Sequence, residues 1–178
     1  MYSSEKILQV IGYILSLNAG KMNLLKLMKE LYLIDRQSIE LRETSISGDT
    51  YFSMDHGPIL SYTLNLLSAV RDDVGFLSDY IDITKGNLYK ADVKIKKETT
   101  ISLLSKRDLM IIEDIHAKFL NHTPKEIEDY THELPEWKNP SGSSVKIRYS
   151  DIMKALGRTD EDIAIAKSEY EAISNLIS

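Results

Sequence analysis

The sequence predicts a mainly α-helical domain of the α+β class, with a small antiparallel β-hairpin or sheet. Apolar residues recur at intervals of three and four along most of the chain, as they do on the buried face of a helix. Apolar and polar residues alternate strictly over 89–96, which is typical of a half-buried strand. With 178 residues, of which 43% are hydrophobic, the chain can bury one sizeable core. We therefore expect a single domain over 1–178, in which 159–178 is a C-terminal helix.

The first two helices are predicted from capping residues and apolar stripes. Ser3 or Ser4 can cap the first helix, and Gly20 ends it because glycine accepts the left-handed conformation found after helices. Asn23 can cap the second helix, which runs to about Arg42. Its apolar stripe is wide, which indicates a central position in the fold, and comprises Leu24, Leu25, Leu27, Met28, Leu31, Leu33 and Ile34.

The middle of the chain predicts a turn, a third helix and a hairpin. Thr44–Met54 is expected to form turns and short extended structure around Gly48. Pro58 is expected in the first turn of the third helix, where its missing N–H costs nothing. This helix would bury Ile59, Leu60, Leu64, Leu67 and Val70. Asp79–Ile83 and Tyr89–Ile95 are expected to pair as a hairpin.

The C-terminal half contains two capping boxes. In the first, Ser105 is the cap and Asp108 the third helical residue; in the second, Thr123-Pro124-Lys125-Glu126 places proline at the first helical position. A loop from Glu133 to Ser144 follows the second of these helices. A short helix is then expected from Ser150 to Gly157, and Thr159 with Asp162 opens the last helix.

Charge and composition argue against several functional classes. The net charge is −5, whereas proteins that bind nucleic acid usually present a basic face, so direct nucleic-acid binding is not expected. The basic run 94–97 is short, and a solvated strand edge explains it. The chain has no cysteine, which fits a cytoplasmic protein. The apolar N-terminal run has Glu5 at its start and no cleavage pattern after it, so we expect a core helix there and no membrane segment.

No residue pattern predicts catalysis or a cofactor. The four histidines, His56, His116, His122 and His132, lack the spacing of a metal site, and His116 shares the apolar stripe of its helix. Asp55 and His56 could act as a base and its orienting acid, but neighbours in sequence rarely adopt that geometry. We interpret Asp55-His56-Gly57-Pro58 as a structural turn. We expect no catalytic residue, no metal and no cofactor.

Three features leave a structural and a functional interpretation open. Trp137 could anchor a partner or pin its own loop to the core. Asp35 could be buried with Tyr32, Arg36 or a loop amide as partner, or could lie at the polar edge of its helix. The last helix could present its apolar stripe, including Tyr170 and Ile173, to another protein or pack on its own domain. Our candidates for partner-binding residues are Trp137, Tyr170 and Ile173.

A set of residues spread over the chain resembles the pattern of one known family. The set comprises Lys26, Leu27, Tyr32, Asp35, Gly48, Tyr51, Gly57, Pro58, His132 and Trp137. Together with Leu31, Leu33 and Pro135, these residues resemble the Panacea domain, the SocA-like antitoxin family that is often found beside toxins and in prophages. The resemblance extends from the first helix to about Tyr149 and is most specific from Leu24 to Pro58.

The resemblance implies the antitoxin of a toxin–antitoxin module, with a role in phage defence. Such an antitoxin binds its cognate toxin protein directly and is not an enzyme. Two alternatives stay open: an adaptor that delivers the toxin to a AAA+ protease, and a phage-associated regulatory module that binds another protein. A small hydrolase that uses His56 with Asp55 or Asp35 is a weaker alternative. A homo-oligomer is compatible with all of them.

Overall fold

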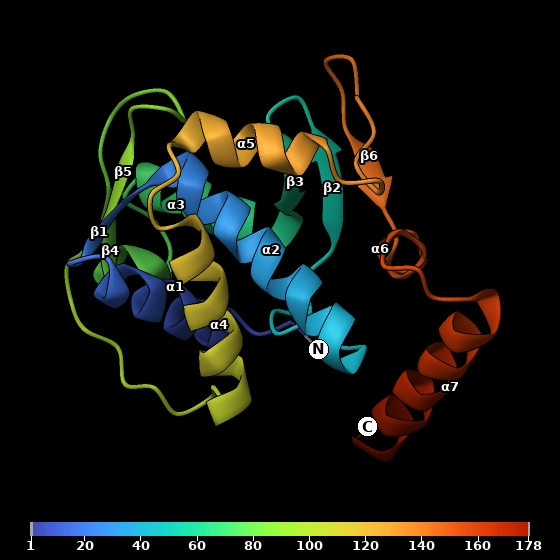
Figure 1. The fold of residues 1–178 in the computed structure, drawn as a ribbon. Helices are drawn as coiled ribbons and strands as arrows, with labels where there is room; N and C mark the ends of the chain where they lie inside the picture. The colour runs from blue at the N-terminus through green and yellow to red at the C-terminus, as the bar shows by residue number, and fades with distance from the viewer. Residues whose placement is uncertain (1, 178) are drawn as a thin grey trace.

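The computed structural model describes residues 2–177, with side chains described for 2–168, and confirms a mainly helical α+β fold (Figure 1). In chain order the elements are α1 (Ser4–Leu17), β1 (Lys21–Asn23), α2 (Leu24–Arg42), β2 (Tyr51–Met54), β3 (Gly57–Leu60), α3 (Ser61–Arg71), the 3-10 helix η1 (Phe76–Asp79), β4 (Ile81–Ile83), β5 (Asp92–Ile95), α4 (Lys106–Phe119), α5 (Pro124–His132), β6 (Val145–Ile147), α6 (Tyr149–Ala155) and α7 (Asp160–Ile177).

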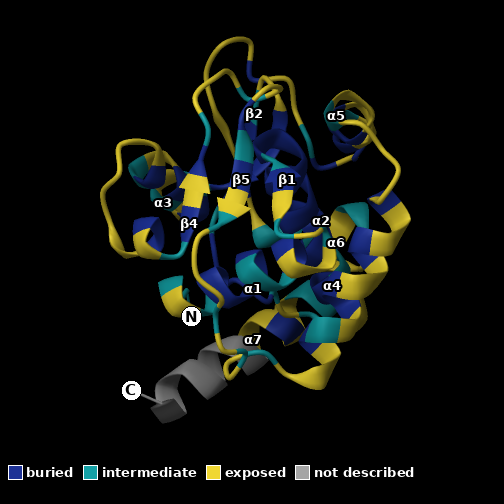
Figure 2. Ribbon diagram, turned by 90° about the vertical axis from the view of Figure 1, so that its left-hand side faces the viewer, coloured by how far each residue is buried: buried dark blue, intermediate teal, exposed yellow. Residues whose placement is uncertain are grey.

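Helix α2 runs through the middle of the molecule, as its wide apolar stripe predicts. It contacts β3, α4, α5 and α6, and every residue from Leu24 to Asp35 is buried (Figure 2). The side chain of Asn23 accepts a hydrogen bond from the backbone N–H of Lys26, so the predicted cap is confirmed. Burial of each large aliphatic side chain contributes about 1.5–3 kcal/mol, so the buried stripe of α2 contributes substantially to core stability.

The predicted pairing of Asp79–Ile83 with Tyr89–Ile95 is confirmed for β4 and β5, which form part of a three-stranded antiparallel sheet in the order β1-β5-β4. The predicted ends are wrong, because Asp79 belongs to η1 and residues 89–91 lie outside the strand. The third strand, β1, was not predicted and pairs Met22 with Val93. Met22 and Val93 are both buried, whereas Lys21 and Lys94 lie opposite each other and are exposed. One face of the sheet is therefore solvated, in agreement with the interpretation of the basic run 94–97.

The second sheet corrects the prediction for Pro58. Its order is β3-β2-β6, and Pro58 lies in β3 opposite Ser53 of β2. Ile59 and Leu60 are strand residues as well, so the predicted start of the third helix is wrong. Proline fits here because β3 is an edge strand, where a missing N–H breaks no hydrogen bond to a second neighbour. Helix α3 begins at Ser61 instead.

Asp49 caps α3 from a distance. Its carboxylate accepts hydrogen bonds from the backbone N–H groups of Tyr62 and Thr63, at 2.9 Å each, and from the Thr63 hydroxyl at 2.8 Å. The residue at the cap position, Leu60, has no side chain that can accept a hydrogen bond. A loop residue therefore satisfies the helix start, a role that its position in sequence does not reveal.

The remaining helices begin largely where the capping signals place them. Both predicted capping boxes, at Ser105 and Thr123, are present. Helix α6 begins at Tyr149, slightly before the predicted Ser150, and β6 was not predicted. Within the described part of the chain, none of the helices combines the length and the hydropathy of a membrane-spanning segment. The side chains of two predicted partner-binding residues, Tyr170 and Ile173, lie outside the described part of the chain.

Candidate functional site

Helix α2 carries charged side chains that are buried inside the fold. Lys29 and Glu30 have no exposed surface, and Asp35 is 1% exposed. A buried charge is costly unless hydrogen bonds or an opposite charge compensate it. Each of these side chains binds a segment that is distant in sequence, so α2 acts as the polar framework that holds the loops and short helices in place.

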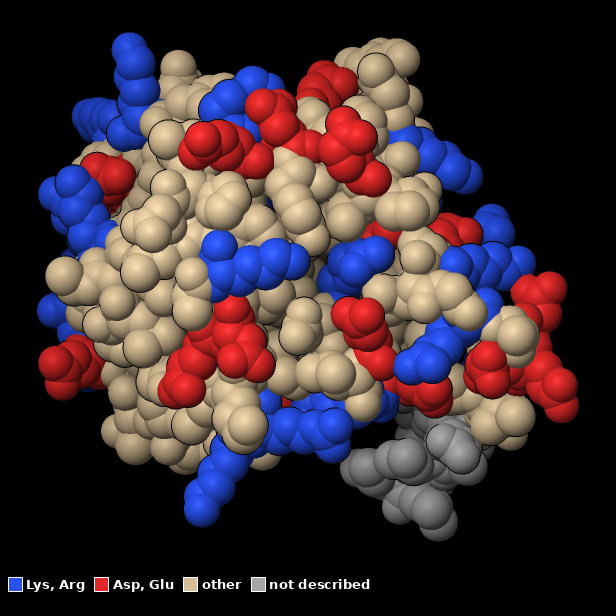
Figure 3. Space-filling view, in the orientation of Figure 1, with Lys and Arg blue, Asp and Glu red and all other residues tan. Residues whose placement is uncertain are grey.

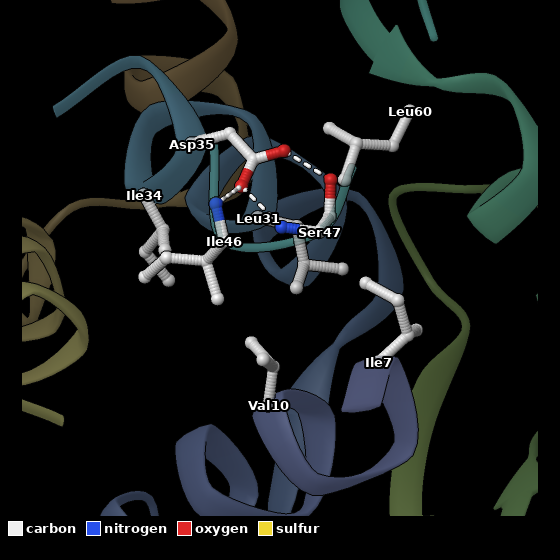
Figure 4. Close-up of a pocket in the computed structure, with 8 residues that line it drawn as sticks. All are labelled: Ile7, Val10, Leu31, Ile34, Asp35, Ile46, Ser47 and Leu60. Carbon is white, nitrogen blue, oxygen red and sulfur yellow. Dashed lines mark hydrogen bonds between the residues drawn. The ribbon is translucent and has the colours of Figure 1, made fainter. Parts of the chain in front are cut away.

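Asp35 fixes the loop that leads into β2 (Figure 4). Its Oδ1 accepts the backbone N–H groups of Ile46 and Ser47, at 2.9 Å each, and its Oδ2 accepts the hydroxyl groups of Ser47 and Tyr51. Burial raises the pKa of Asp35, and these hydrogen bonds offset part of the rise. Of the partners proposed from sequence, the loop amide is confirmed, whereas Tyr32 and Arg36 bind elsewhere.

Lys29 binds the backbone of β3 directly after the turn between β2 and β3. Its Nζ donates to the carbonyl oxygen of Pro58 at 2.9 Å. A Cβ atom at Gly57 would lie 3.0 Å from this Nζ and 2.7 Å from Oγ1 of Thr131. Gly57 also has φ +91, which favours glycine. Burial lowers the pKa of Lys29 to about 7, although the nearby charge of Glu128 raises it in part.

We expect Lys29→Met to flatten the pH dependence of stability in mildly alkaline solution. An unfolded lysine keeps its proton up to about 10.5, whereas folded Lys29 loses it above about 7. The unfolded state therefore binds more protons in this window, and wild-type stability rises with pH by up to about 1.4 kcal/mol per unit. Urea denaturation at several pH values between about 7 and 10.5 measures how the free energy of unfolding changes with pH. Exposed Lys94→Met is the control, and equal slopes in the two variants would refute the assignment.

The loop after α5 is fastened to α2 through Glu136. Its Oε1 accepts hydrogen bonds from the hydroxyl of Tyr32, at 2.9 Å, and from Nε of Arg36, at 2.7 Å. Glu136 is 3% exposed, so this pair of donors compensates a buried charge. Sequence reasoning missed Glu136, because acidic residues in a loop usually face solvent.

Trp137 serves the fold and remains partly accessible. Its ring stacks on His132 with the ring centroids 4.2 Å apart, and its Nε1 donates to the carbonyl oxygen of Met54 at 3.3 Å. The indole is partly buried. The structural interpretation of Trp137 is therefore supported. Part of the ring is nevertheless exposed to solvent. Burial lowers the pKa of His132.

A fourth buried contact joins α2 to α4. Oε2 of Glu30 lies 2.9 Å from Nδ1 of His116, which is 5% exposed, as expected for a core histidine. Nζ of Lys26 donates to the carbonyl oxygens of Leu120 and His122, at 2.8 and 2.9 Å. Lysine thus satisfies the carbonyl of the C-cap residue Leu120, which the helix cannot satisfy itself, and that of His122 just after it.

The β2–β3 turn reaches the surface beside α5. His56 lies in this turn, and its Nδ1 is 3.0 Å from Oε1 of Glu128 in α5. The hydroxyl of Tyr89 donates to Oε2 of Glu128 at 2.5 Å. Glu128 is 2% exposed, and although burial raises its pKa, the hydrogen bonds from Tyr89 and His56 hold that pKa below its usual value. One buried carboxylate thus orients two exposed side chains.

Four side chains around this turn form what we call the turn patch: Asp55, His56, Tyr89 and Trp137. The rings of His56 and Tyr89 meet edge to face with centroids 5.5 Å apart. Oδ1 of Asp55 accepts the backbone N–H of Gly142 at 3.0 Å, and Trp137 is held to Met54. The patch therefore combines segments from the turn, the loop before β5 and the loop after α5.

The structure does not bring together the residues that a His/Asp hydrolase would use. His56 is oriented by Glu128, whereas Asp55 holds Gly142 and Asp35 is buried against Ser47 and Tyr51. Among the described side chains, no group of three or more His, Asp or Glu residues is arranged to hold a metal ion. Sequence reasoning placed His56 in a turn but missed Glu128 and Tyr89, which only the tertiary fold brings to it.

One comparison with known proteins gives a match. A family model described as "Antitoxin SocA-like, Panacea domain" matches residues 27–138. The matched segment contains the buried charges of α2 from Lys29 onward and every member of the turn patch. No curated protein and no solved structure matches the chain.

Proposed function

Because the chain belongs to the antitoxin SocA-like, Panacea domain family, we propose that it neutralises a cognate toxin by binding that protein directly. The family match over 27–138 is the observation that carries this proposal. In this proposal the protein acts by stoichiometric binding and not by turnover.

The arrangement of polar groups supports a binding scaffold. Asp35, Lys29 and Glu136 each use their charged atoms to fasten a loop or turn to α2. Such a framework keeps loops rigid without secondary structure of their own, and a rigid surface loses less entropy when it binds a partner. The exposed β2–β3 turn at Asp55 and His56 is followed directly by one such contact, because Lys29 binds the carbonyl oxygen of Pro58 in β3.

We expect protection to depend on the ratio of this protein to the toxin. The test co-expresses the chain, at graded levels, with the protein encoded by the adjacent gene and measures growth. Size-exclusion chromatography of the purified mixture should show a complex, because stoichiometric neutralisation requires one. Growth should recover only when this protein is at least as abundant as the toxin.

Other outcomes separate the alternatives. Protection far below stoichiometric levels, with loss of the toxin from the cell, would favour an adaptor that delivers the toxin to a protease. Protection at such levels with the toxin intact and no complex would favour an enzyme. Asp35→Asn is the matched variant, because a hydrolase that uses Asp35 would lose protection, whereas a binding protein that stays folded should keep most of it; Asp35 is buried and lies outside any surface contact.

A further inference from the structure

We propose that the turn patch, Asp55, His56, Tyr89 and Trp137, is the surface that binds the toxin, and that the toxin presents basic residues to it. This inference rests on the proposed function. It names the contact surface and the chemistry of the partner.

The first argument is that exposed rings are held in place at a structural cost. Tyr89 is 39% exposed, and the side chain of His56 is 48% exposed. Both are fixed by Glu128, whose side chain is 3% exposed, and burial of a carboxylate costs free energy. Surface rings need no such support for folding. Aromatic side chains that are already ordered are the usual anchors of protein interfaces, because little entropy is lost on binding.

The second argument is that the patch adjoins an acidic helix. Acidic side chains gather along α5 at the top of the molecule (Figure 3). Those that are exposed in and directly after α5 are Glu126, Asp129 and Glu133, against one exposed lysine, Lys125. Asp55 adds a further exposed acid within the turn patch. Opposite charge accelerates association and favours the correct orientation, so basic residues of the toxin are expected to face α5.

The neighbouring lysines do not reverse this balance along α5. Lys90 and Lys138 are exposed and each follows an aromatic member of the patch in sequence. Neither lysine belongs to α5, so the excess of acids along that helix is unchanged. A partner with basic residues on one side of an apolar or aromatic centre fits this distribution. An arginine suits it best, because its guanidinium both pairs with carboxylates and stacks on rings.

The test measures the affinity of purified variants for the protein encoded by the adjacent gene. Tyr89→Ala removes an exposed ring and should weaken binding by at least about tenfold, as anchors do. Its matched control is Tyr62→Ala, which removes a ring that is 50% exposed on α3. Glu133→Lys should slow association and reduce its dependence on salt, whereas Asp114→Lys on α4 should not. Thermal melting verifies that each variant is folded.

The outcomes distinguish this inference from the proposed function. Tight binding by the wild type, with losses confined to Tyr89→Ala and Glu133→Lys, supports both. Equal binding by these variants and their controls would refute the turn patch as the contact while the antitoxin function stood. If the folded wild type does not bind the adjacent gene product at all, the proposed function fails and this inference fails with it.

Discussion

Replacing Gly57 with alanine is expected to lower the free energy of unfolding by about 3–5 kcal/mol. A Cβ atom at this position would lie 2.7 Å from Oγ1 of Thr131, closer than carbon and oxygen atoms approach without a bond. It would also crowd Nζ of Lys29, whose hydrogen bond to Pro58 supports the turn. With φ +91, any side chain adds backbone strain to this crowding.

Gly20→Ala is the matched control, because Gly20 has φ +79 but a Cβ atom added there would meet no atom within 4 Å. Its free energy of unfolding should therefore fall only by the cost of the left-handed backbone conformation, about 1–2 kcal/mol. In thermal unfolding each kcal/mol corresponds to about 2–4 °C for a chain of this length, so the two variants are easily separated. Equal losses would show that a Cβ atom at Gly57 does not clash with Thr131 and Lys29 as the structure indicates.

Local signals predicted the helices well. Asn23, Ser105 and Thr123 cap α2, α4 and α5 as expected, because a cap depends on residues within one turn of the helix. The prediction that Pro58 starts a helix was wrong because a helix start and an edge strand both tolerate a missing N–H. Only the pairing of β3 with β2 decides between them. Strands of three residues, such as β1 and β6, are too short for alternation to identify.

The site was less predictable, because its contacts join segments that are far apart in sequence. His56 and Glu128 are 72 positions apart, and Tyr32 and Glu136 are 104 apart. The charged residues of α2 suggest the polar face of an amphipathic helix, although α2 is buried on all sides from Leu24 to Asp35. The only local hint was the unusual width of its apolar stripe, which leaves no solvated face for Lys29 and Glu30.

Asp35→Ala is expected to be comparably damaging, with a loss of about 3–5 kcal/mol. The carboxylate accepts four hydrogen bonds, from the N–H groups of Ile46 and Ser47 and the hydroxyls of Ser47 and Tyr51. Alanine would leave these buried donors without an acceptor among apolar neighbours such as Ile34 and Leu60 (Figure 4). Each buried polar group left unpaired costs about 1–3 kcal/mol.

Asp35→Asn separates the hydrogen bonds from the charge. The asparagine oxygen can still accept the two backbone N–H groups, and its amide can donate to the hydroxyls of Ser47 and Tyr51, which can turn to accept. We therefore expect a smaller loss of stability, about 1–2 kcal/mol, as measured by urea denaturation. The control is Asp114→Ala at an exposed position, which should change stability by less than about 0.5 kcal/mol. If Asp35→Ala were as stable as Asp114→Ala, the carboxylate would not hold the loop. If alanine and asparagine were equally damaging, the negative charge itself, and not the geometry of its acceptors, would be what the loop requires.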